Sequence, residues 1–398
     1  YTKEAHADEK NVACTNHSAE QEEAGSSHFS IDYADDRISI AWDDAPDGPA
    51  RRTFAVDFSN RTETKNALKE HLYRLLEEEM GQPLPWGTLT GIRPTKIPMA
   101  LLEEGKSEEE IAEIEKACIV TADMHLTAMR TVRPGIRESD VAAAVAEVAF
   151  ANNYQLSFPI IATINGQTLH NHDHSHMIKS GDMLLLDAGA ETEMGYAGDM
   201  SSTIPADSKF TTRQKDIYDI QVAAHEAAVA ALRPGIPFVD VYELSCKVIM
   251  EGLKDLGFVK GDPMEAVKAG AHAMFMPCGL GHMMGLDVHD MENLGEIWVG
   301  YNGQPKSTQF GRKSQRLAIP LEPGFVHTVE PGIYFIPELI DMWKAEKKFT
   351  DFINYEIVET YKDFGGIRNE EDYLITETGA RRLGKKIPLT PEEVEALR

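Results

Sequence analysis

An internal repeat constrains the fold of this 398-residue chain more than any other feature of its sequence. The segment HLTAMRTVRPGIRESDV begins at His125, and HEAAVAALRPGIPFVDV begins one hundred residues later, at His225. The His, the RPGI string and the DV pair coincide in the two copies. In each copy a helical pattern stops at Arg-Pro-Gly, because proline cannot continue a helix and glycine frees the backbone. A second helical pattern follows, so the repeat predicts a duplicated α/β unit.

Short apolar runs with the character of β-strands lie between and after the two copies. We therefore expect residues 114–398 to form one α+β domain of two related halves, with a ligand cleft between them. Residues 1–113 form a separate N-terminal segment of small α/β type. In it, residues 28–42 alternate as a strand or hairpin does, and residues 63–80 carry apolar groups at helical spacing. The strand-like runs of the larger domain are 159–164, 183–190, 324–335 and 371–376.

The charge and the cysteines of the chain exclude several classes of function. Its 39 Lys and Arg against 65 Asp and Glu give a net charge of −26, which argues against a nucleic-acid partner. No apolar run approaches the roughly 20 residues of a membrane helix, so no membrane partner is expected. The four cysteines lie far apart without a CxxC pair. This pattern favours a reducing, cytoplasmic setting over a disulfide framework.

Oxygen and nitrogen donors recur next to apolar or glycine-rich stretches. Asp187 ends an apolar strand-like run, and Asp199 follows twelve residues later. Each donor alone is also compatible with an ordinary turn or loop residue. Together, four carboxylates and one imidazole suit Mn²⁺, Co²⁺ or Zn²⁺, and bridging carboxylates could hold two such ions. The other donors are His282 in GLGHMMGLDVHD, Glu330 in TVEPGIYF and Glu370 in GIRNEED.

These motifs carry a family resemblance over about 285 residues. DAGAETEMGYAGD, GLGHMMGLDVHD, TVEPGIYF and GIRNEED occur in an order that resembles the pita-bread metallopeptidases, the family of methionine aminopeptidase, aminopeptidase P and prolidase. The resemblance implies a fold with an internal pseudo-twofold axis, which agrees with the repeat. It also implies two divalent ions, most often Mn²⁺, and proline-containing peptides as substrates. It allows a homodimer.

The resemblance implies a role for each matching residue. Asp187 would bind one ion through both oxygens, Asp199 and Glu370 would bridge, and His282 with Glu330 would complete the second site. Glu330 would also relay the proton during hydrolysis. The non-ligand residues are His170, which would contact the substrate, His289, near the proline pocket, and Arg368, which would organise the bridging carboxylates.

Two positions bear on which member of the family this chain resembles most. Proline-specific members usually carry His four residues before the metal-binding His, and Cys278 stands there. Prolidases bind the terminal carboxylate of a dipeptide with an arginine, and the position of Arg316 resembles the position of that arginine. The alternative that Arg316 is a solvated surface residue stays open. The preferred hypothesis is that the chain is a Xaa-Pro aminopeptidase. The alternatives are a Xaa-Pro dipeptidase and a pita-bread protein that binds without turnover.

The front of the chain does not resemble the creatinase-like domain that precedes the catalytic domain in aminopeptidase P. The string WGTLTGIRPTK, residues 86–96, instead resembles the N-terminal region of radical-SAM coproporphyrinogen dehydrogenase-like proteins. That family's CxxxCxxC cluster motif is absent from the sequence, so porphyrin chemistry is excluded.

Overall fold

A computed structural model describes residues 29–34, 36–42, 50–56, 61–80 and 107–398. The chain divides into two compact units, residues 1–96 and 97–398. The string at residues 86–96 lies outside the described residues. In the first unit the elements are β1 (Phe29–Ala34), β2 (Arg37–Trp42), β3 (Ala50–Ala55) and α1 (Arg61–Met80).

The first unit is a small antiparallel sheet with a helix packed on it. The strand order is β1–β2–β3, which confirms the strand pattern expected at residues 28–42. Ile38 and Ile40 of β2 point to the same side, because side chains alternate along a strand, and both are fully buried. Leu75 of α1 packs into the same cluster. The helix predicted at residues 63–80 is therefore present, and its apolar side covers the sheet.

The second unit contains the repeat and the larger part of the fold. In it, runs of helices are followed by runs of strands, and all the strand pairs described are antiparallel, as in an α+β fold. Its helices are α3 (Ser107–Thr131), α4 (Glu138–Ala151), α5 (Thr212–Ala231), α6 (Phe238–Asp255), α7 (Pro263–Ala269), α8 (Glu292–Tyr301), α9 (Pro337–Ala345), α10 (Tyr355–Val358) and α11 (Pro391–Glu395). Its strands are β4 (Gln155–Leu156), β5 (Ile161–Thr163), β6 (Met183–Ala188), β7 (Ala190–Glu191), β8 (Met200–Pro205), β9 (Val326–Val329), β10 (Gly332–Phe335), β11 (Gly365–Arg368), β12 (Glu371–Ile375) and β13 (Ala380–Arg382).

The two copies of the repeat fold alike. Helices α3 and α5 end one hundred residues apart, and α4 and α6 begin one hundred residues apart. Between the helices, Gly135 and Gly235 have φ values of +91° and +82°. The Gly135 amide donates to the Ile178 carbonyl at 2.9 Å, and the Gly235 amide donates to the Leu321 carbonyl at 2.7 Å. The two copies predicted from the sequence thus share the same helix boundaries, the same glycine conformation and an equivalent backbone hydrogen bond.

Replacing Gly135 or Gly235 with Ala is expected to lower the free energy of unfolding by about 1 kcal/mol each. A Cβ atom at either position meets nothing within 4 Å, so the cost comes from the left-handed backbone alone. Urea unfolding measures it. Gly379→Ala is the matched control, because its Cβ also meets nothing and its φ lies outside the left-handed range. An equal change in all three variants would contradict this account.

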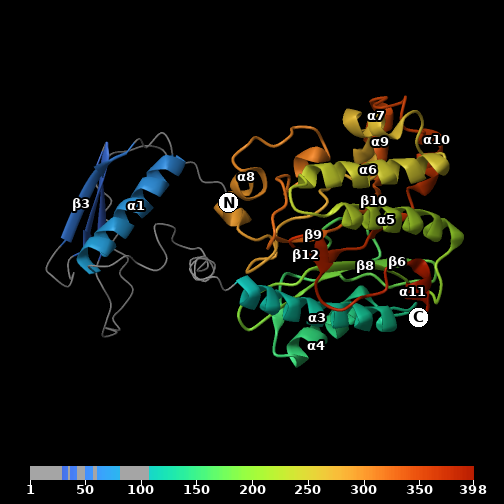
Figure 1. Cartoon of the computed structure of the whole chain (residues 1–398), viewed down its shortest axis with the longest axis horizontal. Helices are drawn as coiled ribbons and strands as arrows, with labels where there is room; N and C mark the ends of the chain where they lie inside the picture. Colours follow the sequence, from blue (N-terminus) through green and yellow to red (C-terminus); the bar gives the residue numbers. More distant parts are fainter. Residues whose placement is uncertain (1–28, 35, 43–49, 57–60, 81–106) are drawn as a thin grey trace. The chain divides into compact units, whose positions relative to one another are not determined.

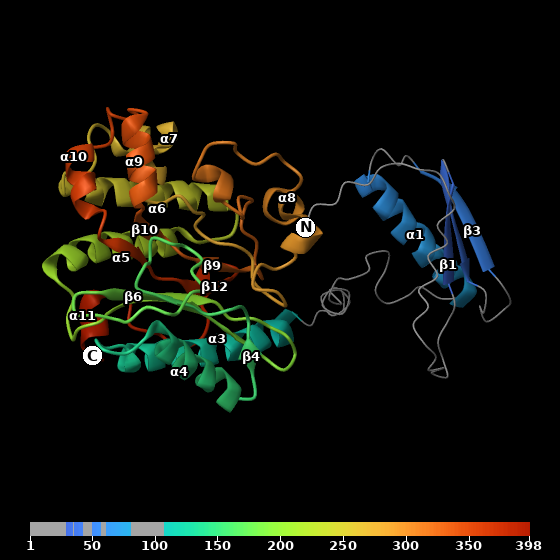
Figure 2. The same ribbon diagram turned by 180° about the vertical axis from the view of Figure 1, so that it is seen from behind.

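The strands of the second unit lie between the two helix pairs. In both views α3 and α4 lie on one side of the strands and α5 and α6 lie on the other (Figure 1, Figure 2). The strand orders are β5–β6–β8, β13–β12–β9 and β10–β11. Leu184 and Leu186 of β6 and Val241 and Ile249 of α6 belong to one fully buried cluster. Burial of this apolar surface is the main force that holds the two halves together.

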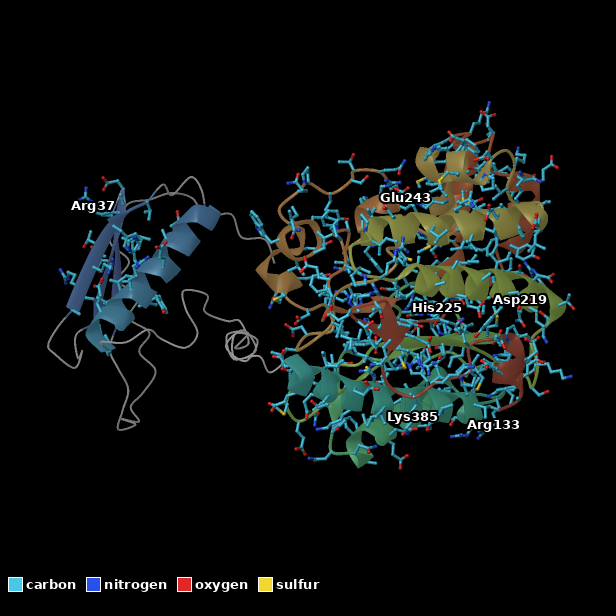
Figure 3. The ribbon with its side chains drawn as sticks, in the orientation of Figure 1. Arg37, Arg133, Asp219, His225, Glu243 and Lys385 are labelled. Atoms are coloured by element: carbon cyan, nitrogen blue, oxygen red, sulfur yellow. The ribbon has the colours of Figure 1, made fainter. Side chains whose placement is uncertain are left out.

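The repeat histidines are buried on their helices, as expected for structural residues. The Nε2 of His125 donates to the Ala188 carbonyl at 3.1 Å, and its Nδ1 accepts from the Ser202 hydroxyl at 2.9 Å. Burial lowers the pKa of His125 to about 4, so the ring is neutral. His225 is a buried residue of α5 in the second unit (Figure 3), and its Nε2 lies 3.9 Å from a Glu371 oxygen.

Helix α3 spans the position at which the sequence places the domain boundary. It begins at Ser107, and Ile111 and Ile114 pack with Leu383 and Ile387 in a cluster of the second unit. The predicted boundary at residue 113 therefore falls inside a helix whose apolar residues contact the larger unit. Among the described helices, none combines the length and the apolar character needed to cross a membrane.

Candidate metal centre

All nine site residues predicted from the sequence line one cavity of about 400 Å³ in the second unit. They come from segments up to two hundred residues apart in the sequence, so the fold itself brings them together. The cavity also has an apolar wall, made of Phe158, Pro159, Ile161, Leu169 and Val288.

The first half of the repeat supplies Asp187 and Asp199. Asp187 is the penultimate residue of β6, and Asp199 immediately precedes β8. The antiparallel register pairs Asp187 with Ser201, so that both carboxylates reach the same end of the sheet. Both residues are less than 10% exposed. A charge at such a position is costly unless a partner compensates it.

The second half supplies the remaining three donors. Glu370 lies between β11 and β12, and its amide donates to the Ser201 carbonyl at 3.0 Å, which joins the two halves directly. Glu330 follows β9, and its amide donates to the Leu280 carbonyl at 2.8 Å. The carbonyl of His282 accepts from the Thr328 amide at 3.0 Å. These backbone contacts place His282 beside the end of β9.

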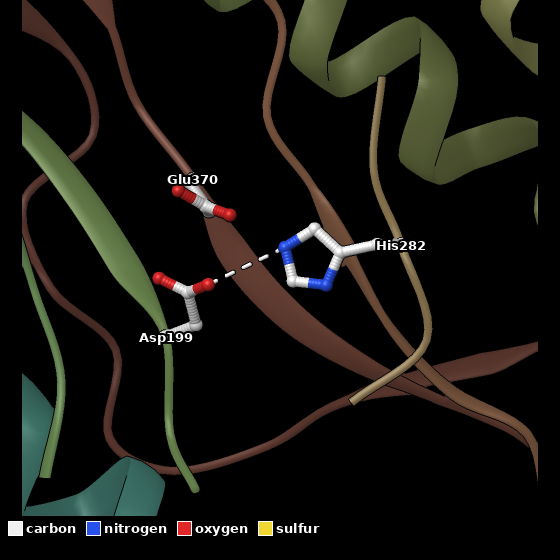
Figure 4. A group of neighbouring side chains, drawn as sticks. All are labelled: Asp199, His282 and Glu370. Carbon is white, nitrogen blue, oxygen red and sulfur yellow. Dashed lines mark ion pairs between the residues drawn. The ribbon is translucent and has the colours of Figure 1, made fainter. Parts of the chain in front are cut away.

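Three of the donors converge closely. Asp199, His282 and Glu370 each offer an atom within 4.8 Å of the other two, and all three are buried (Figure 4). The Nε2 of His282 lies 3.4 Å from an Asp199 oxygen and 3.8 Å from a Glu330 oxygen. Its Nδ1 lies 3.0 Å from the Met283 carbonyl, which accepts a hydrogen bond from the protonated Nδ1 and leaves Nε2 without a proton. A neutral imidazole in this tautomer is a metal ligand.

The negative charges of these buried carboxylates are only partly neutralised by neighbouring protein groups. Burial and the neighbouring Asp187 raise the pKa of Asp199 well above its usual value, and burial with Asp199 does the same for Glu370. Asp187 Oδ1 and Asp199 Oδ1 are buried, and no described residue donates to them. Carboxylates crowded in this way fit the binding of divalent cations, which removes the repulsion and occupies the unpaired oxygens.

Arg368 is a fully engaged structural cation beside these carboxylates. Its Nη2 donates to Asp187 Oδ2 at 2.5 Å, and its Nη1 donates to the Tyr334 hydroxyl at 3.0 Å. Its Nε donates to the Ser201 hydroxyl at 2.9 Å, and that hydroxyl in turn donates to Glu370 at 2.7 Å. Arg368 thereby fixes one carboxylate directly and a second one through Ser201.

The remaining cavity residues lie around the donors. The ring of His289 lies 4.1 Å from the ring of His282, measured between centroids. Burial, with a smaller effect of Arg368, lowers the pKa of His170, so its imidazole is neutral at pH 7. Arg316 is 36% exposed in its side chain. Burial raises the pKa of Cys278 to about 12, so its thiol stays protonated at neutral pH.

Sequence reasoning missed several residues that position the site. Ser201 lies two residues after Asp199, a spacing that points both side chains to one face of an extended strand. Glu292 lies three residues after His289 across the turn that precedes α8, and its carboxylate lies 3.4 Å from the His289 Nδ1. Asp372 lies two residues after Glu370, and its carboxylate accepts from the Asp199 amide at 3.1 Å. In contrast, no local sequence pattern indicated that Tyr334 contacts Arg368.

Comparisons with known proteins agree with this geometry. Residues 112–377 match the model of metallopeptidase family M24. The chain is 36% identical over 315 residues to the Xaa-Pro aminopeptidase of Escherichia coli strain K12, covering 78% of this chain and 62% of that protein. It is 32% identical over 299 residues to the human Xaa-Pro dipeptidase, covering 73% and 59%. The chain therefore spans about three fifths of the length of these relatives.

Solved structures give the same result for the fold. The aminopeptidase PepP of Pseudomonas aeruginosa is 28% identical, with a TM-score of 0.62 over 85% of this chain and 69% of that one. A zinc-substituted aminopeptidase P of Escherichia coli in complex with product is 27% identical, with a TM-score of 0.62 over 91% and 85%. These neighbours confirm the predicted pita-bread fold.

The matched family segment does not include residues 86–96, so their resemblance to radical-SAM proteins stays a prediction. For the larger unit, the family model covers most of the predicted catalytic region. The predicted donors also meet in one cavity there. By sequence and by fold, the chain belongs to metallopeptidase family M24.

Proposed function

We propose that this chain is a metal-dependent exopeptidase that hydrolyses Xaa-Pro bonds at the N-termini of peptides. The observation that carries the proposal is the meeting of Asp199, His282 and Glu370 within 4.8 Å, in a cavity that Asp187 and Glu330 also line. These five residues would hold two divalent ions, with Mn²⁺ as our first choice and Co²⁺ or Zn²⁺ as alternatives. Such ions supply a nucleophilic water at neutral pH and polarise the scissile carbonyl.

The protein's own side chains would transfer the proton, bind the peptide and hold the carboxylates in place. Glu330 is 21% exposed in its side chain, against 7% for Asp199, so it is the carboxylate best placed to exchange protons with water. It would take a proton from the attacking water and return it to the proline nitrogen as the bond breaks. Neutral His170 can donate one hydrogen bond to the peptide. Arg368 would keep Asp187 and Glu370 in place throughout.

The apolar wall supports a preference for proline. Phe158, Ile161 and Val288 offer carbon surface to a pyrrolidine ring, which has no backbone N–H to satisfy. A Xaa-Pro dipeptidase is the second candidate, because Arg316 also lines the cavity and a guanidinium binds a terminal carboxylate well. The cytoplasmic setting and the homodimer remain predictions from the sequence.

Cleavage assays test the proposal. Protein loaded with Mn²⁺ is expected to cleave a Xaa-Pro-Yaa tripeptide, and a chelator is expected to abolish this cleavage. Cleavage of a Xaa-Pro dipeptide alone would favour the dipeptidase. If neither peptide is cleaved by protein that holds Mn²⁺, the chain is better described as a binding protein with this fold, and the proposal fails.

A further inference from the structure

The cavity presents two guanidinium groups, and only one of them is available to a ligand. Arg368 is 4% exposed and uses Nε, Nη1 and Nη2 on Ser201, Tyr334 and Asp187. Arg316 is 36% exposed in its side chain, and its described hydrogen bond runs from Nη1 to Glu292 Oε2 at 2.5 Å. Among the described residues that line the cavity, Arg316 is therefore the cation that an anionic ligand would meet.

Glu292 compensates the charge of Arg316 through a direct ion pair. It opens α8 and is 13% exposed in its side chain. The same oxygen that accepts from Arg316 lies 3.4 Å from Nδ1 of His289. Burial opposes ionisation of Glu292, but the hydrogen bond with His289 and the charge of Arg316 outweigh it and lower the pKa of Glu292. The carboxylate is therefore ionised at neutral pH, and the Glu292–Arg316 pair is neutral overall.

The backbone around Glu292 is held in an uncommon conformation. Met291 immediately before it has a φ of +56°, and Gly295 breaks the helical geometry with a φ of +136°. A left-handed conformation costs a non-glycine residue about 1 kcal/mol or more, and it persists where the surroundings fix it. This backbone conformation at the start of α8 places the Glu292 side chain against Arg316 and His289.

We propose that Glu292 is a positioning residue that sets substrate length, because it neutralises Arg316 and so weakens the attraction of the cavity for a free carboxylate on proline. The inference rests on the proposed function. It deepens that function by predicting that longer Xaa-Pro-Yaa peptides are favoured over Xaa-Pro dipeptides. A substrate carboxylate that binds Arg316 must also approach the like charge of Glu292, which repels it. An uncharged amide at the same position is not repelled.

The sharpest test compares two substrates that differ in that charge alone. Ala-Pro and Ala-Pro amide have the same length and the same scissile bond. In Glu292→Gln, kcat/KM for Ala-Pro relative to the amide is expected to rise about five- to tenfold, mainly through KM. Because both substrates are measured on one Mn²⁺-loaded preparation, the ratio does not depend on the fraction of folded protein.

Three further variants separate this role from a merely structural one. Glu292→Asp keeps the charge and should leave the ratio within about twofold of the parent value. Glu296→Gln is the matched control, because Glu296 lies on the same helix and pairs with Lys306 instead. In an Arg316→Gln background, Glu292→Gln should raise the ratio less than in the parent, since it then relieves only the direct repulsion and frees no guanidinium for the carboxylate.

The outcomes distinguish this inference from the proposed function. An unchanged or lower ratio in Glu292→Gln, with a parent protein that cleaves both substrates, overturns the inference alone. A rise of equal size in the Arg316→Gln background overturns it as well, because the effect would then not depend on Arg316. A metal-loaded parent that cleaves neither substrate contradicts the proposed function and this inference together.

Discussion

Replacing Asp199 with Asn is expected to abolish metal-dependent hydrolysis while making the metal-free protein harder to unfold. Hydrolysis should fall about 10³-fold or more, because the variant loses a negatively charged ligand from the centre of the candidate site. Addition of Mn²⁺ should raise the melting temperature of the parent by mass action and leave that of the variant nearly unchanged.

The gain in stability of the metal-free variant follows from the raised pKa of Asp199. Burial and neighbouring carboxylates raise this pKa in the folded state, whereas in the unfolded chain it stays near its usual value of about 4. The folded state thus binds more protons, and the stability of the parent falls as pH rises above about 4. Asn stays neutral, so the advantage of Asp199→Asn should be absent below pH 4 and reach about 1 kcal/mol or more at pH 7.

Urea unfolding with a chelator at the two pH values measures this difference. Asp216→Asn, an exposed substitution on α5, should change neither stability nor hydrolysis. A metal-free Asp199→Asn protein that is less stable than the parent at pH 7 would contradict the electrostatic account. Full Mn²⁺-dependent hydrolysis in this variant would contradict the assignment of Asp199 as a ligand.

Replacing Arg368 with Met is expected to destabilise the metal-free protein by about 3–5 kcal/mol. The side chain is 4% exposed and donates to Asp187, Ser201 and Tyr334, which lie on three different strands. Its removal leaves the Asp187 carboxylate buried without a cation and removes the donor to the Ser201 and Tyr334 hydroxyls. Arg368→Lys should fall between the parent and Met, because one ammonium keeps the charge but cannot reproduce the planar contacts.

The matched control is Arg381→Met. Arg381 pairs with Glu115 at 2.5 Å, but its side chain is 48% exposed, so this variant should lose less than about 1 kcal/mol. Urea unfolding in the presence of a chelator compares all the variants at pH 7. Similar losses for Arg368→Met and Arg381→Met would show that burial does not set the strength of the Arg368 contacts.

Much of the fold was predictable because its signals are local. The RPGI breaks mark the ends of α3 and α5, and glycine conformation explains both turns. The strand-like run at 183–190 became β6 and β7, and the run at 324–335 became β9 and β10. The domain boundary was less predictable, because α3 continues through residue 113 without a break and its apolar face contacts distant segments.

The candidate site was predictable as a set of residues but not as a geometry. Family motifs pointed to Asp187, Asp199 and Glu370, and each now lines the cavity. No motif pointed to Glu292, whose contact with Arg316 joins residues 24 positions apart. Such a contact depends on where α8 starts and on the left-handed turn at Met291, which the tertiary packing selects.

The sequence alone determined the duplication, the order of the donors and the chemistry that those donors can support. These properties depend on residue type and on short-range spacing, which the sequence states directly. Only the tertiary structure decided which donors lie close together, that Ser201 links Glu370 to Arg368, and that Glu292 pairs with Arg316. Those contacts arise from strand register and from burial, both of which depend on residues far apart in the chain.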